Sequence, residues 1–440
     1  MSQQPKIIVL DDDPTGSQTV HSCLLLMQWD VDTLRLGLRD DIPICFILTN
    51  TRALTPQNAA DITREVCHNL KIAIDAEKIE DFLIVSRSDS TLRGHYPIET
   101  DIIAQELGEF DAHFLIPAFF EGGRQTIDSI HYLKINGKLT PVHETEFAKD
   151  SVFGYHYSYL PDYVEEKTKG KIKATEVERF LLTDIRTESL ERLKELQDNQ
   201  CAVVDGEIQA DLDKFAQDLL TAAALGKRFL FRSAASILTS LAQLGPQPIV
   251  AEEMAKYKPT DNPGVILVGS HVKKTTQQLQ DLLQQPNIVG IEVDVKQLRD
   301  HPDQKDELLQ EILTQVQKVY DAKNTPAIYT SREELTFETV QKRLDFGVVV
   351  SDFLMQIVQG LPREIGFLII KGGNTSNDVL STGLNLQLVR LLGQVLPGCS
   401  MVKTESNHPL FPNLPVVLFP GNVGDTQGLT TVYSRLSESV

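Results

Sequence analysis

The sequence predicts an α/β protein of two domains, each with a mostly parallel sheet and flanking helices. Short apolar runs of β-forming residues alternate with amphipathic stretches, which is typical of parallel sheets covered by helices. A length of 440 residues favours two or three domains. The proline-rich stretch GPQPIVAEEMAKYKPTDNPG separates two such arrays. We therefore expect a domain at residues 1–245, a linker at 246–264 and a second domain at 265–440.

The first domain contains short apolar runs bounded by turn residues, the pattern of buried strands. These strands are expected to end near Leu10, Leu48, Val85, Pro117, Val204 and Phe231. Amphipathic stretches at residues 56–78 and 212–225 predict helices. Residues 139–175 have no simple period, and their aromatic segment FGYHYSYLPDY is either a packed loop or a lid.

Predicted strands and helices also alternate in the second domain. Its strands are expected to end near Val268, Val293, Tyr329, Ile370 and Phe419. Amphipathic stretches at residues 306–320 and 334–359 predict helices.

Composition excludes several classes of protein. A net charge of -19 argues against a general nucleic-acid binder, which needs a basic surface. No apolar stretch is long enough for a membrane helix, and the first residues lack the pattern of a signal peptide. Five widely spaced cysteines without a CxxC fit a reducing compartment. We expect a cytoplasmic protein that binds neither nucleic acid nor membrane.

Three consecutive acids, Asp11, Asp12 and Asp13, follow the first strand, and Pro14 ends it. Adjacent carboxylates repel one another, so a structural reason for all three is hard to find. They suit a metal contact, a general base or hydrogen bonds to a polyol. Helix capping ahead of Thr15 is the structural alternative. Their place at a strand end favours function, because open α/β sheets bind ligands there.

Arginines follow the next strand ends. Arg52 lies in TNTRAL, and the segment SRSDSTLRG combines two arginines with hydroxyls and Gly94. A guanidinium binds a carboxylate through paired hydrogen bonds, and glycine permits close backbone approach. This pattern predicts an anion site, with a capped helix start at Asp89 or Ser90 as the alternative.

A glycine corner, Gly122 and Gly123, precedes Arg124 in PAFFEGGRQT. The corner either closes over a substrate or simply turns the chain, and the sequence does not favour one interpretation.

Three glycine-containing turns follow strands of the second domain. VGSHVKK contains Ser270 but lacks the second glycine of a Walker A loop. KGGNTS and PGNVG offer paired glycines, hydroxyls and a following helix, which can bind a phosphate through backbone N–H groups. Ordinary glycine turns are the alternative, but three turns in one domain favour a nucleotide site. The glycine fingerprint of dinucleotide-dependent oxidoreductases does not occur.

Together these motifs resemble the four-carbon acid-sugar kinase family. They are DDDPTG, TNTRAL, SRSDSTLRG, PAFFEGGRQT, VGSH, KGGNTS and PGNVGD, and the resemblance covers roughly residues 5–430. Members of this family phosphorylate threonate, erythronate and oxo-tetronate type substrates with ATP. The resemblance implies an N-terminal acid-sugar-binding domain and a C-terminal nucleotide-binding domain.

The resemblance also implies site residues. Those for the sugar acid are Asp12, Asp13, Arg52, Asp89, Ser90, Arg93 and Gly94. Those for ATP are Ser270, Gly372, Gly373, Asn374, Thr375 and Gly421. Two departures stand out: Asn374 replaces the acid of the family's usual GGET turn, and the triple acid is longer than the common acidic pair.

The expected function is ATP-dependent phosphorylation of a hydroxyl on a small, four-carbon sugar acid. Arg52 and Arg93 would hold the substrate carboxylate, while Asp12 or Asp13 would orient or deprotonate the attacking hydroxyl. Backbone amides and Mg²⁺ would balance charge on the transferred group, and domain closure would exclude water. A non-catalytic sugar-acid sensor and a dinucleotide-dependent oxidoreductase are the alternatives. A homodimer is one expected state.

Overall fold

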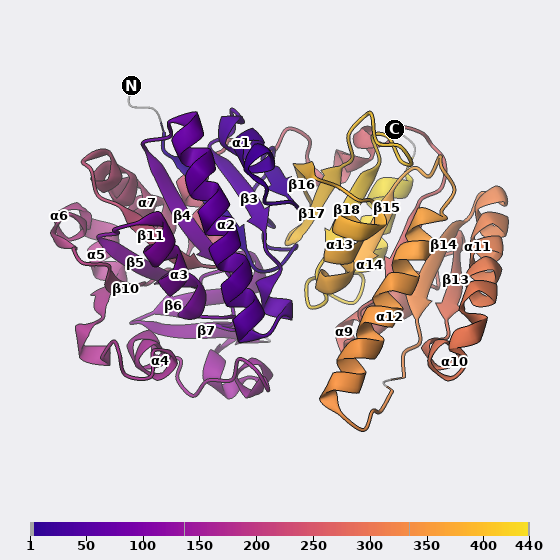
Figure 1. Ribbon diagram of the computed structural model, residues 1–440, viewed down its shortest axis with the longest axis horizontal. Coiled ribbons are helices and arrows are strands. Elements are labelled where there is room, and N and C mark those ends of the chain that lie inside the picture. The colour runs from indigo at the N-terminus through magenta and orange to yellow at the C-terminus, as the bar shows by residue number, and fades with distance from the viewer. Residues whose placement is uncertain (1–3, 136, 334, 439–440) are drawn as a thin grey trace. The chain divides into compact units, whose positions relative to one another are not determined.

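The structure, a computed structural model, describes residues 4–135, 137–333 and 335–438 (Figure 1). Contacts divide the chain into two compact units, Met1–Pro246 and Gln247–Val440. Each unit has a mostly parallel sheet with flanking helices, so the predicted α/β class is confirmed. No helix in these ranges is long and apolar enough to cross a membrane.

The sheet of the first unit is parallel throughout. Its order is β2-β3-β1-β4-β11-β5-β10-β9, and every neighbouring pair is parallel. The strands are β1 (Lys6–Asp11), β2 (Leu24–Leu26), β3 (Ile44–Leu48), β4 (Phe82–Arg87), β5 (Ala112–Ile116), β9 (Glu178–Phe180), β10 (Gln200–Val204) and β11 (Phe229–Ser233). The carboxyl ends of all eight strands therefore meet at one edge.

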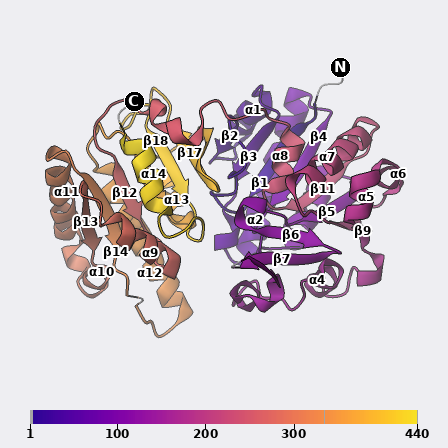
Figure 2. The ribbon, with the colours of Figure 1, turned by 180° about the vertical axis from the view of Figure 1, so that it is seen from behind.

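Helices cover both faces of this sheet. They are α1 (Val31–Arg39), α2 (Pro56–Glu77), α3 (Ile98–Leu107), α4 (Leu160–Lys167), α5 (Leu182–Thr187), α6 (Leu190–Glu195), α7 (Gln209–Ala224) and α8 (Ser236–Ala242). In Figure 1, α2 and α3 lie in front of the strands, whereas α7 and α8 lie in front in Figure 2. Helix α2 begins sharply because Thr55 accepts a hydrogen bond from Asn58 N and Pro56 occupies its first turn.

A small antiparallel sheet interrupts the parallel array. It comprises β6 (Arg124–Ile127), β7 (Ile130–Ile135) and β8 (Lys138–Pro141). Asp128 and Ser129 join β6 to β7 with φ angles of 53° and 63°, the two left-handed residues of a tight hairpin turn. The sequence analysis did not predict these strands, because this turn lacks the usual glycine.

The second unit has five parallel strands and two antiparallel ones, in the order β13-β14-β12-β15-β18-β17-β16. The strands are β12 (Val265–Val268), β13 (Ile288–Val293), β14 (Thr325–Thr330), β15 (Leu368–Lys371), β16 (Leu388–Leu396), β17 (Cys399–Lys403) and β18 (Pro415–Phe419). The helices are α9 (Lys273–Leu282), α10 (Val295–Asp300), α11 (Lys305–Asp321), α12 (Val340–Gln359), α13 (Gly373–Asp378), a π-helix (Val379–Gly383) and α14 (Gly428–Ser437). Helix α12 lies in front of this sheet in Figure 1 and α14 in Figure 2.

The predicted strands and helices are confirmed, with ends that differ by a few residues. The helix predicted from residue 334 begins at Val340, and Glu334 itself lies outside the described residues. Short 3-10 helices occupy Thr51–Ala53, Phe120–Gly122, Val142–Glu144, Glu146–Lys149, Ala174–Glu176, Ala251–Tyr257 and Pro302–Gln304. The 3-10 helix Ala251–Tyr257 lies in the predicted linker, and its Met254 is buried in the core of the second unit.

Candidate active site

The polar segments predicted for the first domain meet at one edge of its sheet. Asp11 ends β1, and it pairs in register with Leu48 at the end of β3 and with Arg87 at the end of β4. Arg87 pairs in turn with Ser233, the last residue of β11. The segments that follow these strands are therefore neighbours. Of the predicted residues, Asp12, Asp13, Arg52, Asp89, Arg93 and Gly94 form one connected cluster.

The three consecutive aspartates lie in three different environments. Asp11 is fully buried, with Oδ1 3.3 Å from Nη1 of Arg87 and with Oδ2 lacking a hydrogen bond. Burial raises the pKa of Asp11 to about 7, although Arg87 opposes the shift. Asp12 accepts a hydrogen bond of 2.5 Å from Ser88 Oγ, and its Oδ1 has no hydrogen bond. Burial also raises the pKa of Asp12, with Arg52 opposing it.

Asp13 is the one aspartate of the three whose pKa is lowered. Burial alone would raise its pKa, but Arg52, Arg87 and hydrogen bonds from Thr15 outweigh burial and lower it. Arg52 Nη2 forms an ion pair with Asp13 Oδ2, and Thr15 N donates to Asp13 Oδ1 at 2.8 Å. A carboxylate held in this way is a weak base, so the aspartates differ in the chemistry that they can perform.

Arg52 and Arg93 converge on Asp89. Nη1 of Arg52 lies 3.5 Å from one oxygen of Asp89, and Nε of Arg93 donates to the other at 2.8 Å. Burial alone would raise the pKa of Asp89, but Arg93 and Arg52 lower it. The Arg93 guanidinium also lies over the ring of Phe147, 4.9 Å from its centroid. The loop of residues 88–94 is thus held by charge as well as by its backbone.

Arg232 is a site residue that the sequence analysis missed. It lies on β11 and is 8% exposed; its Nη1 donates to Glu99 Oε2 at 2.6 Å and its Nη2 to Ser88 Oγ at 2.8 Å. Gly94, with φ of 125°, passes so close that a Cβ would lie 2.5 Å from Nη2 of Arg232. Glycine is therefore required at position 94. The signal in the sequence was an arginine inside the apolar run FLFRS.

The aromatic segment of residues 153–163 packs behind this loop. Tyr155 and Tyr163 are each 3% exposed, and their hydroxyls donate at 2.8 Å to the backbone oxygens of Thr91 and Leu92. These contacts support the packed-loop interpretation over the lid. Ser90, another predicted site residue, is held by the hairpin β6–β7, because His131 Nε2 donates to its backbone oxygen at 2.8 Å.

The glycine turns of the second unit also meet at a sheet edge. They follow β12, β15 and β18, which are neighbours in the order β12-β15-β18. Ser270 N donates to Lys371 O at 3.2 Å, and Gly372 N donates to Phe419 O at 2.9 Å. A Cβ on Gly372, whose φ is 129°, would lie 3.1 Å from Ser270 Cβ. A Cβ on Gly421 would lie 3.3 Å from Ser270 Oγ.

The backbones of these three turns therefore pack closely against one another. Asn374 is exposed at the turn, and Gly373, Asn374 and Thr375 form the first residues of α13. The first N–H groups of a helix have no partner within it, so they are available to a ligand. All six residues predicted to bind ATP lie in or beside this set of turns.

Lys371 links the turn that follows β15 to the turn that follows β18. Its side chain is completely buried, and its Nζ donates to Pro420 O at 2.5 Å and to Gly421 O at 3.2 Å. The ammonium group also lies 4.0 Å from the centroid of the Phe419 ring. Burial lowers the pKa of Lys371 to about 7. Arg332, which the sequence analysis missed, donates from Nη1 to Ser270 O at 2.7 Å.

The described residues contain no group of three or more His, Cys, Asp or Glu side chains that could hold a metal ion. Mg²⁺ commonly binds through one or two carboxylates together with substrate phosphates, so it needs no such group. The hydroxyls of Ser270 and Thr375 and the amide of Asn374 are among the oxygen ligands that the glycine turns offer.

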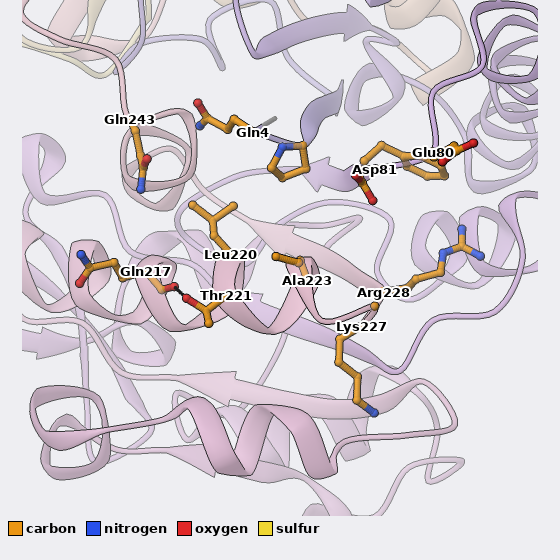
Figure 3. Close-up of a pocket in the computed structure, with 14 residues that line it drawn as sticks. Gln4, Glu80, Asp81, Gln217, Leu220, Thr221, Ala223, Lys227, Arg228 and Gln243 are labelled. Atoms are coloured by element: carbon orange, nitrogen blue, oxygen red, sulfur yellow. Dashed lines mark hydrogen bonds between the residues drawn. The ribbon is translucent and has the colours of Figure 1, made fainter. Parts of the chain in front are cut away.

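A cavity of about 710 Å³ lies at the other end of the first sheet. Figure 3 shows Gln4, Asp81 and Arg228 around it, and these residues lie just before or at the starts of β1, β4 and β11. Ligands of parallel sheets bind at the carboxyl ends of the strands. The charged cluster, rather than this cavity, is therefore the candidate active site.

Two family models match this chain. Residues 7–241 match a family model described as a sugar-binding N-terminal domain, and residues 265–429 match one described as a nucleotide-binding C-terminal domain. The D-erythronate kinase of Heliobacterium modesticaldum is 23% identical over 466 aligned positions, which cover 98% of this chain and 97% of that protein.

Two solved structures share the fold. A protein from Salmonella typhimurium LT2 superposes with a TM-score of 0.70 at 19% identity, covering 98% of both chains. A protein from Haemophilus influenzae gives a TM-score of 0.64 at 16% identity, covering 98% of this chain and 100% of its own. At these identities the likeness shows the fold alone.

Proposed function

The chain belongs to the four-carbon acid-sugar kinase family, and from that premise we propose that it transfers the γ-phosphoryl group of ATP to a hydroxyl of a four-carbon sugar acid. The observation that carries the proposal is the buried cluster of arginines and aspartates at the carboxyl ends of β1, β3, β4 and β11. Such a cluster can bind the carboxylate and the hydroxyls of a small acid at once.

Asp12 is the proposed general base. Its raised pKa suits proton abstraction from a hydroxyl, and its Oδ1 accepts no hydrogen bond from the described residues, although Arg52 and Arg87 each lie 3.9 Å from it. Arg52 lowers the pKa of Asp13, which makes Asp13 the weaker base. We assign to Asp13 the role of orienting Arg52. Arg52, Asp89, Ser90, Arg93 and Gly94 complete the proposed sugar-acid site.

The glycine turns of the second unit are the proposed ATP site, with Ser270, Gly372, Gly373, Asn374, Thr375 and Gly421 around the phosphates. Their support is the close approach of the three turns to one another and the N–H groups at the start of α13, which can bind phosphate oxygens. Mg²⁺, when bound with ATP, neutralises charge on the transferred group. Phosphoryl transfer then depends mainly on positioning and electrostatics.

A coupled assay of ADP release with a panel of aldonates tests this proposal. Each acid is compared with the alditol of the same length and stereochemistry, which lacks the carboxylate. The expected result is ADP release that depends on one or a few four-carbon acids. Saturable binding of an acid without turnover would instead identify a sensor.

A further inference from the structure

Arg124, the first residue of β6, carries a charge that its surroundings do not neutralise. Among the described residues it forms no ion pair with a carboxylate, and its Nε is buried without a hydrogen bond. Nη1 donates to the backbone oxygen of Gly122, and the guanidinium lies 5.9 Å from the centroid of the Phe119 ring. The side chain is partly buried, and its guanidinium keeps a positive charge that can bind an anion through paired N–H donors.

The glycine corner places Arg124 beside the candidate active site. The corner follows the end of β5, which is the neighbour of β11 in the sheet. Phe120 N donates at 3.1 Å to the hydroxyl of Ser236, three residues beyond the end of β11. The sheet edge that carries the buried cluster therefore also carries this corner.

The hairpin that begins with Arg124 is bonded directly to the 88–94 loop. Thr126 Oγ1 lies 2.9 Å from Nδ1 of His131, whose Nε2 donates at 2.8 Å to Ser90 O. Burial lowers the pKa of Arg124, and the charge of Asp89 opposes that shift. Arg124 is thus a member of the same site.

The other arginines of the cluster already have carboxylate partners. Arg52 pairs with Asp13 and Asp89, Arg93 pairs with Asp89, Arg87 pairs with Asp11, and Arg232 pairs with Glu99. Each of these four guanidinium groups thus has a carboxylate partner, and together they pair with Asp11, Asp13, Asp89 and Glu99. Arg124, by contrast, has none among the described residues.

We propose that Arg124 is the residue that binds the carboxylate of the acid substrate and so distinguishes an aldonate from the corresponding alditol. This inference rests on the proposed function. Arg52 and Arg93 then shape the pocket through Asp13 and Asp89. The guanidinium offers paired N–H donors to a carboxylate, as in other charge-assisted pairs.

Kinetics and calorimetry on the full chain test this assignment. Arg124→Gln should raise the KM and the dissociation constant for the best aldonate of the panel about 100-fold, with a much smaller change in kcat. Guanidinium ion added to Arg124→Ala should restore part of the affinity. Arg179→Gln is the matched control, since Arg179 donates to Ser129 Oγ at the turn of the same hairpin. It should leave the KM unchanged.

These measurements distinguish a wrong assignment of Arg124 from a wrong proposal of kinase activity. Wild-type turnover of an aldonate with an unchanged KM in Arg124→Gln would overturn the inference and leave the kinase intact. An equal loss of affinity in Arg179→Gln, or a loss without rescue by guanidinium, would also overturn it, because the hairpin rather than the charge would then matter. If the wild-type chain binds no aldonate in calorimetry, both proposals fail.

Discussion

Burial and charge partners shift the pKa values of three adjacent aspartates in different directions. Asp11 and Asp12 have raised pKa values because they are buried, while Arg52 holds the pKa of Asp13 down. The sequence showed only three equivalent acids. The partners that separate them lie 39 and 76 residues away in the chain, so composition and spacing alone could not assign the roles.

Asp12→Asn should reduce kcat by a factor of about 10²–10⁴, the usual contribution of a positioned base. The amide keeps the size of the side chain, so the dissociation constant for the aldonate should change little. Initial-rate kinetics and calorimetry on the same preparation measure the two quantities. Asp13→Asn serves as the comparison: a larger loss of kcat in that variant would show that Asp13, not Asp12, is the general base.

Asp11 makes the free energy of unfolding depend on pH. Its pKa is about 7 in the folded protein and near 3.9 in an unfolded chain. Between these values the folded state binds a proton more tightly, so its stability falls as the pH rises. Asp11→Asn removes this effect, and the stability of the variant relative to wild type should rise from pH 4 to pH 7, by on the order of 4 kcal/mol.

Denaturant titrations of wild type and Asp11→Asn from pH 4 to pH 7 measure the difference in their free energies of unfolding. A difference that stays constant with pH would contradict the buried, protonated state of Asp11. Asp89→Asn is the control: the pKa of Asp89 is lowered, so its stabilising effect is lost only below about pH 4, and the difference between this variant and wild type should stay nearly constant from pH 4 to pH 7.

At the scale of elements, the 88–94 loop is shaped by neighbours far along the chain. Tyr155, Tyr163 and His131 each hold one of its backbone oxygens. The sequence predicted this loop as an anion site because its polar residues directly follow an apolar strand. It left the aromatic segment between two interpretations, since a buried tyrosine and a lid tyrosine have the same local pattern.

Tyr155→Phe and Tyr163→Phe should each lower the free energy of unfolding by about 1 kcal/mol, the net value of one hydrogen bond. Both variants should also raise the KM for the aldonate, since the loop loses a fixed point. Thermal melting and initial rates provide the measurements. Tyr157→Phe is the control, as that side chain is 47% exposed. Unchanged kinetics in both buried variants would show that the tyrosines do not position the loop.

Other elements could not be predicted, for identifiable physical reasons. Strands β16 and β17 pair with register shifts between Leu391 and Gly393 and between Gln394 and Leu396. Such bulges break the alternation by which a half-buried strand is recognised. The sequence shows Arg232 as a charged residue within an apolar run. Its partner Glu99 lies 133 residues away, and no local pattern links the two.

At the scale of the whole molecule, an acidic chain is proposed to bind two anionic ligands. The net charge of -19 repels both a sugar acid and ATP, so attraction must come from local groups. The first unit concentrates arginines at one sheet edge, and the second concentrates backbone N–H groups at glycine turns. The sequence predicted these two kinds of site because each lies where an apolar strand ends.

The most direct measurement follows the phosphoryl group itself. The protein is incubated with ATP, Mg²⁺ and the best four-carbon acid, and ³¹P NMR with mass spectrometry identifies the products. We expect one phosphorylated acid for every ADP formed, with no reaction of the matched alditol. ADP accompanied by inorganic phosphate and an unmodified acid would contradict it.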